Sequence, residues 1–144
     1  MEAPLGPHRE APSDAHEYYD ESYRFSLFYP KNLDVKKIDE GSGVSTIIFQ
    51  NPQEGKGFQI FIVPYAGSQV SEDQFKKDVP SGVRKNVSEV VVDGVLGASF
   101  HSSSISLGET REVWFISNGF LYEVTAPRAL EPWLSVILQT WKFL

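Results

Sequence analysis

The feature that most constrains this fold is an Asn-Gly pair, Asn118-Gly119, between two runs of β-branched and aromatic residues. A type I′ turn needs positive φ at both central positions, and Asn and Gly adopt that conformation more readily than other residues. The flanking runs, residues 110–117 and 120–126, suit a half-buried pleated surface. The sequence therefore predicts a hairpin here, and with it an antiparallel sheet.

A two-residue turn also fixes which residues of the hairpin share a face. On one face Phe115 pairs with Tyr122, and on the other Trp114 pairs with Glu123. We interpret the Phe115 face as core. We also assign Trp114 to the core, beneath the last helix of the chain, although an uncovered Trp114 beside Glu123 would suit contact with a partner or a sugar.

Further strands follow from alternating or continuous apolar patterns. A second tight hairpin is centred on Asp93-Gly94, between strands over residues 87–92 and 95–104. Four earlier strands are predicted over residues 23–30, 35–38, 45–50 and 58–65. The last of these is nearly continuous apolar, which is typical of a central strand covered on both faces.

Two helices complete the prediction. Ser71 and Gln74 have the spacing of a capping box, so a short helix begins at Ser71 and ends near Asp78. Apolar residues recur at helical spacing from Leu130 to Trp141, which predicts an amphipathic helix there. The order of strands, helix, strands and helix predicts an α+β domain with a mostly antiparallel sheet and helices packed on its faces, an α/β/α sandwich.

The charge of the chain is unevenly distributed. The 144 residues carry a net charge of −6, but residues 1–22 hold six acidic residues and one basic residue, so the remainder is nearly neutral. Residues 1–22 also contain three prolines and few apolar side chains. Such a segment buries too little surface to offset its ordering entropy. We predict a disordered acidic, Pro-rich leader over residues 1–22 and one domain over residues 23–144.

Composition argues against several classes of function. No basic footprint is present to face phosphates, so nucleic-acid binding is not expected. The absence of Cys excludes disulfides, thiolate catalysis and Cys-ligated metals. No apolar run approaches the ~20 residues of a membrane-spanning helix. The glycines form no dinucleotide-binding fingerprint, and we predict no cofactor and no metal site.

The side chains that could carry chemistry are few. His101 lies on a Ser-rich strand, but nucleophilic catalysis needs a base beside its nucleophile, and no Gly-x-Ser-x-Gly elbow is present. We interpret His101 as an exposed strand end, Glu109 and Glu112 as surface carboxylates, and His8 and His16 as residues of a flexible segment with no preformed metal site. No catalytic residue is predicted, and His101, Trp114 and Glu123 remain the candidates for a functional site.

Several segments, taken in order, resemble the PsbP-like family (the Mog1/PsbP fold). They are an opening Phe-Ser-Leu-Phe-Tyr-Pro strand, a Ser-x-x-x-Phe helix, a Val-Asp-Gly hairpin, the aromatic Asn-Gly hairpin and a closing helix ending in Trp-Lys-Phe, at residues 25–30, 71–75, 92–94, 112–124 and 134–143. The similarity extends over the chain from Tyr23 onward. It implies an antiparallel sheet sandwiched by helices.

The resemblance implies a range of functions. Members include an extrinsic subunit of photosystem II, a Ran-binding nuclear protein and bacterial lipoproteins of unknown role, and no functional residue is carried over to this chain. The leader is similar to the linkers that join a lipid-anchored Cys to such lipoproteins, which implies an anchor upstream of Met1. The favoured hypothesis is a non-catalytic, extracytoplasmic cell-envelope module that binds or assembles a protein partner. The alternatives are a cytosolic protein-binding adaptor and a small hydrolase that uses His101.

Overall fold

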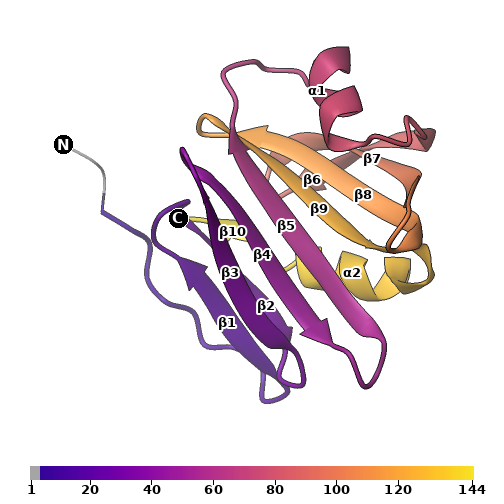
Figure 1. Cartoon of the computed structure of the whole chain (residues 1–144). Coiled ribbons are helices and arrows are strands. Elements are labelled where there is room, and N and C mark those ends of the chain that lie inside the picture. The colour runs from indigo at the N-terminus through magenta and orange to yellow at the C-terminus, as the bar shows by residue number, and fades with distance from the viewer. Residues whose placement is uncertain (1–3) are drawn as a thin grey trace.

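The computed structural model describes residues 4–144, which form two antiparallel β-sheets and two short α-helices (Figure 1). The large sheet has seven strands in the order β3-β4-β5-β9-β8-β7-β6. Its strands are β3 (Asp34–Gly41), β4 (Val44–Asn51), β5 (Lys56–Pro64), β6 (Lys85–Val92), β7 (Val95–Ser104), β8 (Gly108–Ser117) and β9 (Phe120–Pro127). The small sheet has the order β1-β2-β10, with β1 (Ala15–Asp20), β2 (Phe25–Pro30) and β10 (Lys142–Phe143).

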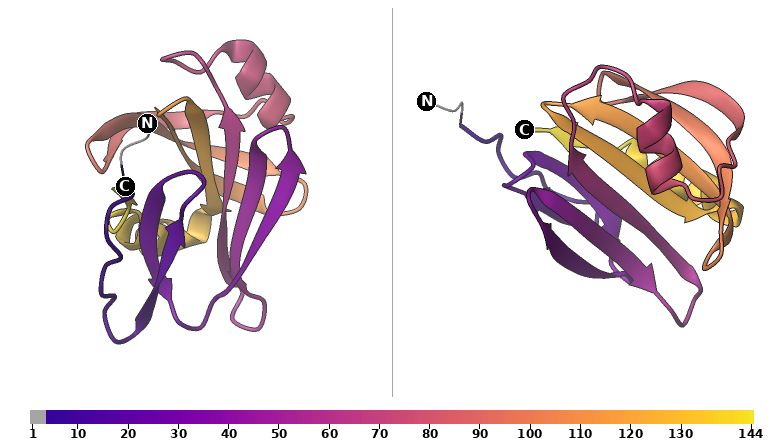
Figure 2. Two further views of the ribbon diagram at one scale, coloured as in Figure 1. Left: turned by 90° about the vertical axis from the view of Figure 1, so that its left-hand side faces the viewer. Right: turned by 45° about the horizontal axis from the view of Figure 1, so that its top comes forward.

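The helices lie on opposite faces of the large sheet (Figure 2). Helix α2 (Glu131–Leu138), which follows a 3-10 turn at Arg128–Leu130, shares one face with the small sheet. Helix α1 (Glu72–Asp78) covers part of the other face and begins as predicted, because the Ser71 hydroxyl accepts a hydrogen bond from the Gln74 backbone N–H at 3.1 Å. The predicted α+β class, with helices on both faces of an antiparallel sheet, is confirmed.

Both predicted tight hairpins are present with the predicted registers. Asn118 and Gly119 have φ of 56° and 84°, and Asp93 and Gly94 have φ of 44° and 79°, as a type I′ turn requires. Phe115 therefore lies opposite Tyr122. These registers determine which side chains of each hairpin point to which face of the sheet, and the core is therefore divided into two clusters.

The two clusters occupy the two faces of the large sheet. The larger cluster lies between that sheet, the small sheet and α2, and includes Phe25, Phe49, Phe115, Tyr122 and Leu134. The smaller cluster lies toward α1 and consists of Phe75, Val79, Phe100, Trp114 and Leu121. Strand β5 is buried on the first face and half-buried on the second, so its continuous apolar run reflects cover on both sides.

The prediction of a disordered leader over residues 1–22 is wrong for Ala15–Asp20, which form β1 and pair antiparallel with β2. Tyr18 of β1 packs on the large core cluster. Asp20 is buried and accepts hydrogen bonds from the Tyr18 hydroxyl at 2.7 Å and from Lys37 Nζ at 2.9 Å. Long-range pairing and these hydrogen bonds supply the stabilisation that composition alone does not indicate. Residues 1–3 of the predicted leader lie outside the described part of the chain.

Residues 4–14, which precede β1, form neither helix nor strand, yet Arg9 attaches them to the domain. The Arg9 guanidinium donates to Ser26 Oγ at 2.8 Å and to the Thr140 carbonyl at 2.7 Å, and it lies over the Phe28 ring at 4.3 Å. Its backbone N–H donates to the Glu17 carboxylate at 2.9 Å. These contacts hold residues around Arg9 against β2 and the C-terminal segment.

The C-terminal helix is shorter than predicted. Helix α2 ends at Leu138, three residues before Trp141. Trp141 instead stacks on Phe25, with ring centroids 4.2 Å apart, and Lys142 and Phe143 then pair with β2 as β10. The apolar spacing up to Trp141 fits a helix, but burial of the indole between the two sheets and the free edge of β2 favour an extended chain.

Candidate functional site

The candidate His101 does not lie at an exposed strand end, so that interpretation is wrong. Its Nε2 contacts the Glu131 carboxylate, and its Nδ1 lies 2.9 Å from the Asn86 side-chain amide. Arg111, its cross-strand neighbour, lies 3.7 Å from the same Glu131. The residues of this cluster join the start of α2 to β6, β7 and β8. Both ring nitrogens of His101 thus have partners, and neither partner is a hydroxyl that could act as a nucleophile.

The other two candidates, Trp114 and Glu123, lie together on the opposite face of the sheet from α2. They are cross-strand partners in β8 and β9, as predicted, and both are buried. Trp114 packs against Phe75 of α1 and Phe100 of β7, with ring centroids 6.0 and 5.4 Å away. The prediction that Trp114 is buried is correct, but the helix that covers it is α1 and not the last helix.

Glu123 lines a pocket of about 460 Å³ beside the C-terminal end of α1. We call it the carboxyl pocket, because the side chains of Asp78, Glu112 and Glu123 converge on it. Ser102 of β7 also lines this pocket, and its Oγ is buried without a hydrogen-bond partner. Lys77 is the basic residue of the lining. The pocket therefore collects acidic and hydroxyl groups from one helix and three strands.

The environment of Glu123 disfavours its ionised form. Burial first, then a hydrogen bond with Asp78, then the negative charges of Asp78 and Glu112 raise the pKa of Glu123 to about 10. Glu123 is 5% exposed, and its Oε2 has no hydrogen-bond partner. At neutral pH Glu123 is consequently a neutral carboxylic acid that donates a hydrogen bond to Asp78.

Glu112 is the second buried acid of the pocket, which corrects its interpretation as a surface carboxylate. Burial raises the pKa of Glu112, against the opposing effect of hydrogen bonds from Thr125 and Trp114. The Thr125 hydroxyl donates to Glu112 Oε1 at 2.7 Å, and Trp114 Nε1 donates to the same oxygen at 3.1 Å. Glu112 is therefore held in a fixed position, while Glu109, three residues earlier, is exposed.

The burial of Glu112 could have been predicted from the sequence, although it was not. Alternation places Glu112 and Trp114 on one face of β8, so a buried Trp114 implies a buried Glu112. No comparable signal points to Asp78 or Ser102. Asp78 reaches the pocket only because α1 docks on the sheet, and Ser102 is one of several serines near the end of β7.

A second hollow lies on the same face, on the other side of α1. We call this cavity of about 500 Å³ the edge groove; it is lined by Val70, Phe75, Val87, Leu96, Trp114 and Ile116, among others. Val87 and Leu96 are exposed, as is Val91, which lies opposite Leu96 in the β6–β7 hairpin. Together they form an apolar strip along the last strand of the sheet.

The two edges of the large sheet differ in chemistry. On β3, one edge strand, the exposed positions include Lys36, Lys37, Asp39 and Glu40, and charges of this kind protect an edge from pairing with other chains. On β6, the other edge strand, a bulge interrupts the first half, but the regular half carries Val residues. The β6 edge is accordingly the less protected of the two.

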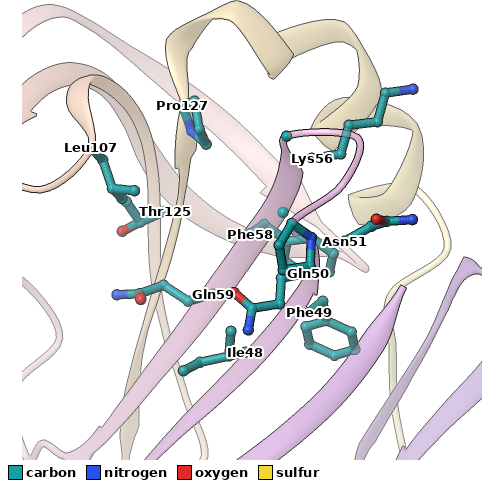
Figure 3. A pocket seen from close by; sticks show the side chains of 13 residues that line it. Ile48, Phe49, Gln50, Asn51, Lys56, Phe58, Gln59, Leu107, Thr125 and Pro127 are labelled. Carbon is teal, nitrogen blue, oxygen red and sulfur yellow. The ribbon is translucent and has the colours of Figure 1, made fainter. Parts of the chain in front are cut away.

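A third, smaller pocket of about 230 Å³ lies where the β4–β5 hairpin meets the end of β9 (Figure 3). Gln59 and Thr125, labelled in Figure 3, line both this pocket and the carboxyl pocket. Lys56 is the charged residue of its lining, and the stacked rings of Phe49 and Phe58 form one wall. With a single charged side chain in its lining, this pocket is a weaker candidate for a binding site than the other two hollows.

Two further features bear on the class of site. Within residues 4–144, no cluster of three or more His, Asp or Glu side chains has an arrangement that could hold a metal ion. His8 contacts Glu17 and stacks on Tyr19, while His16 faces Tyr29. None of the helices in the described part of the chain has the length and apolar character needed to cross a bilayer.

The strand order, with helices on both faces of the large sheet, defines a PsbP-like fold. The chain is similar to a solved structure, that of cyanobacterial PsbP (CyanoP) from Synechocystis sp. PCC 6803. The two superpose with a TM-score of 0.64 over 99% of this chain and 100% of that chain, at 13% sequence identity. No protein-family model matches the sequence, and no curated protein matches it. At this identity the similarity establishes the fold, and the function has to be inferred from the candidate site.

Proposed function

We propose that this protein is a non-catalytic binding module that docks an extended segment of another protein along β6. The observation that carries the proposal is the apolar strip of Val87, Val91 and Leu96 beside the edge groove, on the edge strand that lacks a row of charges. Exposed apolar patches of this kind, rimmed by polar residues, mark interaction sites on soluble proteins. Arg84 and Glu89 provide the polar rim of the groove.

Two sources of binding free energy are available at this edge. An added strand would pair with the backbone N–H and C=O groups that β6 turns away from β7. Alternate side chains of that strand would cover the apolar strip, and full burial of an aliphatic side chain stabilises a complex by ~1.5–3 kcal/mol. The partner that fits is an extended segment with apolar side chains at every second position.

Site-specific photo-crosslinking in the native cell tests the proposal. A photoreactive residue at Val91 is expected to form a defined adduct with one protein, and a second change, Leu96→Lys, is expected to reduce its yield about tenfold, as loss of roughly 1.4 kcal/mol of binding free energy would do. The matched control is Val136 on α2, which is 63% exposed against 67% for Val91. Equal labelling from both positions, or labelling that Leu96→Lys leaves unchanged, would contradict docking at β6.

We propose further that the module acts in the cell envelope, outside the cytoplasm. The acidic, Pro-rich composition of the first residues supports this compartment. Cell fractionation with an antibody against the native protein tests the proposal. Recovery with the envelope supports it, and recovery with the cytosol favours the cytosolic adaptor instead.

A further inference from the structure

We propose that the carboxyl pocket is a second binding site, which takes a small organic cation carrying primary ammonium groups. It lies on the far side of α1 from the edge groove, and the lining residues of the two hollows do not overlap. The inference is therefore independent of the docking of a partner at β6. It rests on three properties of the pocket: its uncompensated acids, its unpartnered polar atoms and its size.

The acids of the pocket lack the cations that normally accompany buried carboxyl groups. Glu112 and Glu123 are both buried, and neither takes part in an ion pair among residues 4–144. Lys77 contributes to the lining, but it lies on the exposed side of α1. A ligand with a positive charge would supply the partner that the fold does not provide.

Three side chains that line the pocket, those of Ser102, Thr110 and Glu123, have a buried oxygen without a hydrogen-bond partner. Glu123 Oε2 and Ser102 Oγ both lack a hydrogen-bond partner, although Ser102 is only 4% exposed. Ser102 comes from β7 and is not part of the acidic cluster, so its orphaned hydroxyl is an independent sign of a missing ligand. An ammonium group has three N–H donors and no acceptor, which matches the carboxyl and hydroxyl oxygens available here.

The size of the pocket limits the ligand to a small molecule. A volume of about 460 Å³ falls in the range of small-molecule sites. The lining also includes Phe61 and Leu107, whose apolar side chains can contact a short alkyl chain. A diamine, with methylene groups between two ammonium ends, combines both requirements.

Binding of such a cation is coupled to the proton of Glu123. Because this carboxyl is protonated at neutral pH, an ammonium group that binds its carboxylate must displace the proton. One proton leaves for each cation bound, and affinity rises with pH by up to about tenfold per pH unit while Glu123 remains mainly protonated in the free protein. Replacement of the O–H···O hydrogen bond between the two carboxyls by N⁺–H···O bonds accounts for the exchange.

Isothermal titration with putrescine as the probe tests this inference on the whole protein. We expect saturable binding that strengthens from about pH 6 to about pH 8, with release of one proton measured from the dependence of the heat on the buffer. Glu123→Gln and Ser102→Ala should each weaken binding at least about tenfold, as expected when a charge-assisted or buried hydrogen bond is lost. Glu40→Gln, at an exposed position on β3, is the matched control and should leave affinity unchanged.

Three results would overturn the inference. These are equal binding of butanediol, the neutral analogue of putrescine; binding without proton release; and affinity that Glu123→Gln leaves intact. The thermal melt of each variant, recorded beside each titration, separates loss of binding from loss of fold. Stronger binding of Nα-acetyl-lysine amide than of putrescine would support the ammonium site and assign its cation to a peptide side chain.

Discussion

Replacement of Glu123 by Gln is expected to flatten the pH dependence of the free energy of unfolding and to raise that free energy at neutral pH. In the folded protein, burial, the hydrogen bond with Asp78 and the charge of Glu112 raise the pKa of Glu123 from an ordinary value of 4.5 to about 10. Between these two values the folded state keeps a proton that the unfolded chain releases. The contribution of Glu123 to stability is therefore fully present below pH 4.5 and is lost as the pH rises toward 10.

The size of the effect follows from proton linkage. One titrating group changes stability by about 1.4 kcal/mol per pH unit within this window, so Glu123 costs the folded state up to about 4 kcal/mol between about pH 5 and about pH 8. Gln has nearly the same shape as Glu and no proton to lose, so the variant should lack most of this slope. Glu112, whose pKa is also raised, should leave a smaller slope of the same sign.

Urea denaturation at a series of pH values measures both quantities. Glu40→Gln, which changes an exposed acid on β3, should show the same slope as the unchanged protein. A Glu123→Gln variant that loses stability with pH as steeply as the unchanged protein would show that Glu123 is ionised in the fold. That result would also remove the proton-release step from the proposed cation binding.

The cost of Glu123 to stability is itself an argument for function. A Val or Leu at this position would pack against Phe61 and Trp114 without any pH-dependent cost, because position 123 faces the interior beneath α1. Buried acids with raised pKa values and unpartnered atoms gather at functional sites more often than elsewhere. A ligand that binds only the folded state would raise the free energy of unfolding with the logarithm of its concentration above Kd.

The sequence predicted well where local chemistry determines the structure. The positive φ values at Asn118-Gly119 and Asp93-Gly94 follow from residue type, and a two-residue turn leaves one register that buries both Phe115 and Val113. Strands β1 and β10 escaped prediction because they exist through pairing with β2. Strand β10 has only two residues, too few for any periodicity to appear.

In the candidate site, too, local contacts could be predicted from the sequence, and contacts between distant segments could not. The pairing of Trp114 with Glu123 could be predicted from the turn, but Asp78 meets Glu123 only because α1 returns over the sheet. His101 looked exposed because its partners, Asn86 and Glu131, come from distant parts of the chain. Contacts of this kind depend on how helices and strands pack against one another. The residue pattern of a single sequence indicates the helices and strands themselves better than it indicates how they pack.

Trp141 joins the two sheets. Trp141→Ala is expected to destabilise the protein by about 3–5 kcal/mol, the usual cost of removing a large buried aromatic side chain. The indole is 3% exposed and stacks on Phe25 of the small sheet at 4.2 Å. It also meets Phe115 and Tyr122 of the large sheet edge-on, at 5.1 and 5.6 Å. Its removal would therefore leave a cavity between the two sheets.

Urea denaturation measures the loss, and two further variants separate its causes. Trp141→Phe should cost less than Trp141→Ala, because it keeps an aromatic ring and removes an indole N–H that is buried without a hydrogen-bond partner. Trp133→Ala, on the half-buried side of α2, controls for loss of any tryptophan and should cost less than Trp141→Ala. Since Phe143 N–H also donates to Asp93 Oδ2 at 2.8 Å, loosening of Trp141 should increase amide exchange at Phe143 and in β10. Equal losses for the two alanine variants would mean that Trp141 does not join the sheets, and that β10 is held by its pairing with β2 alone.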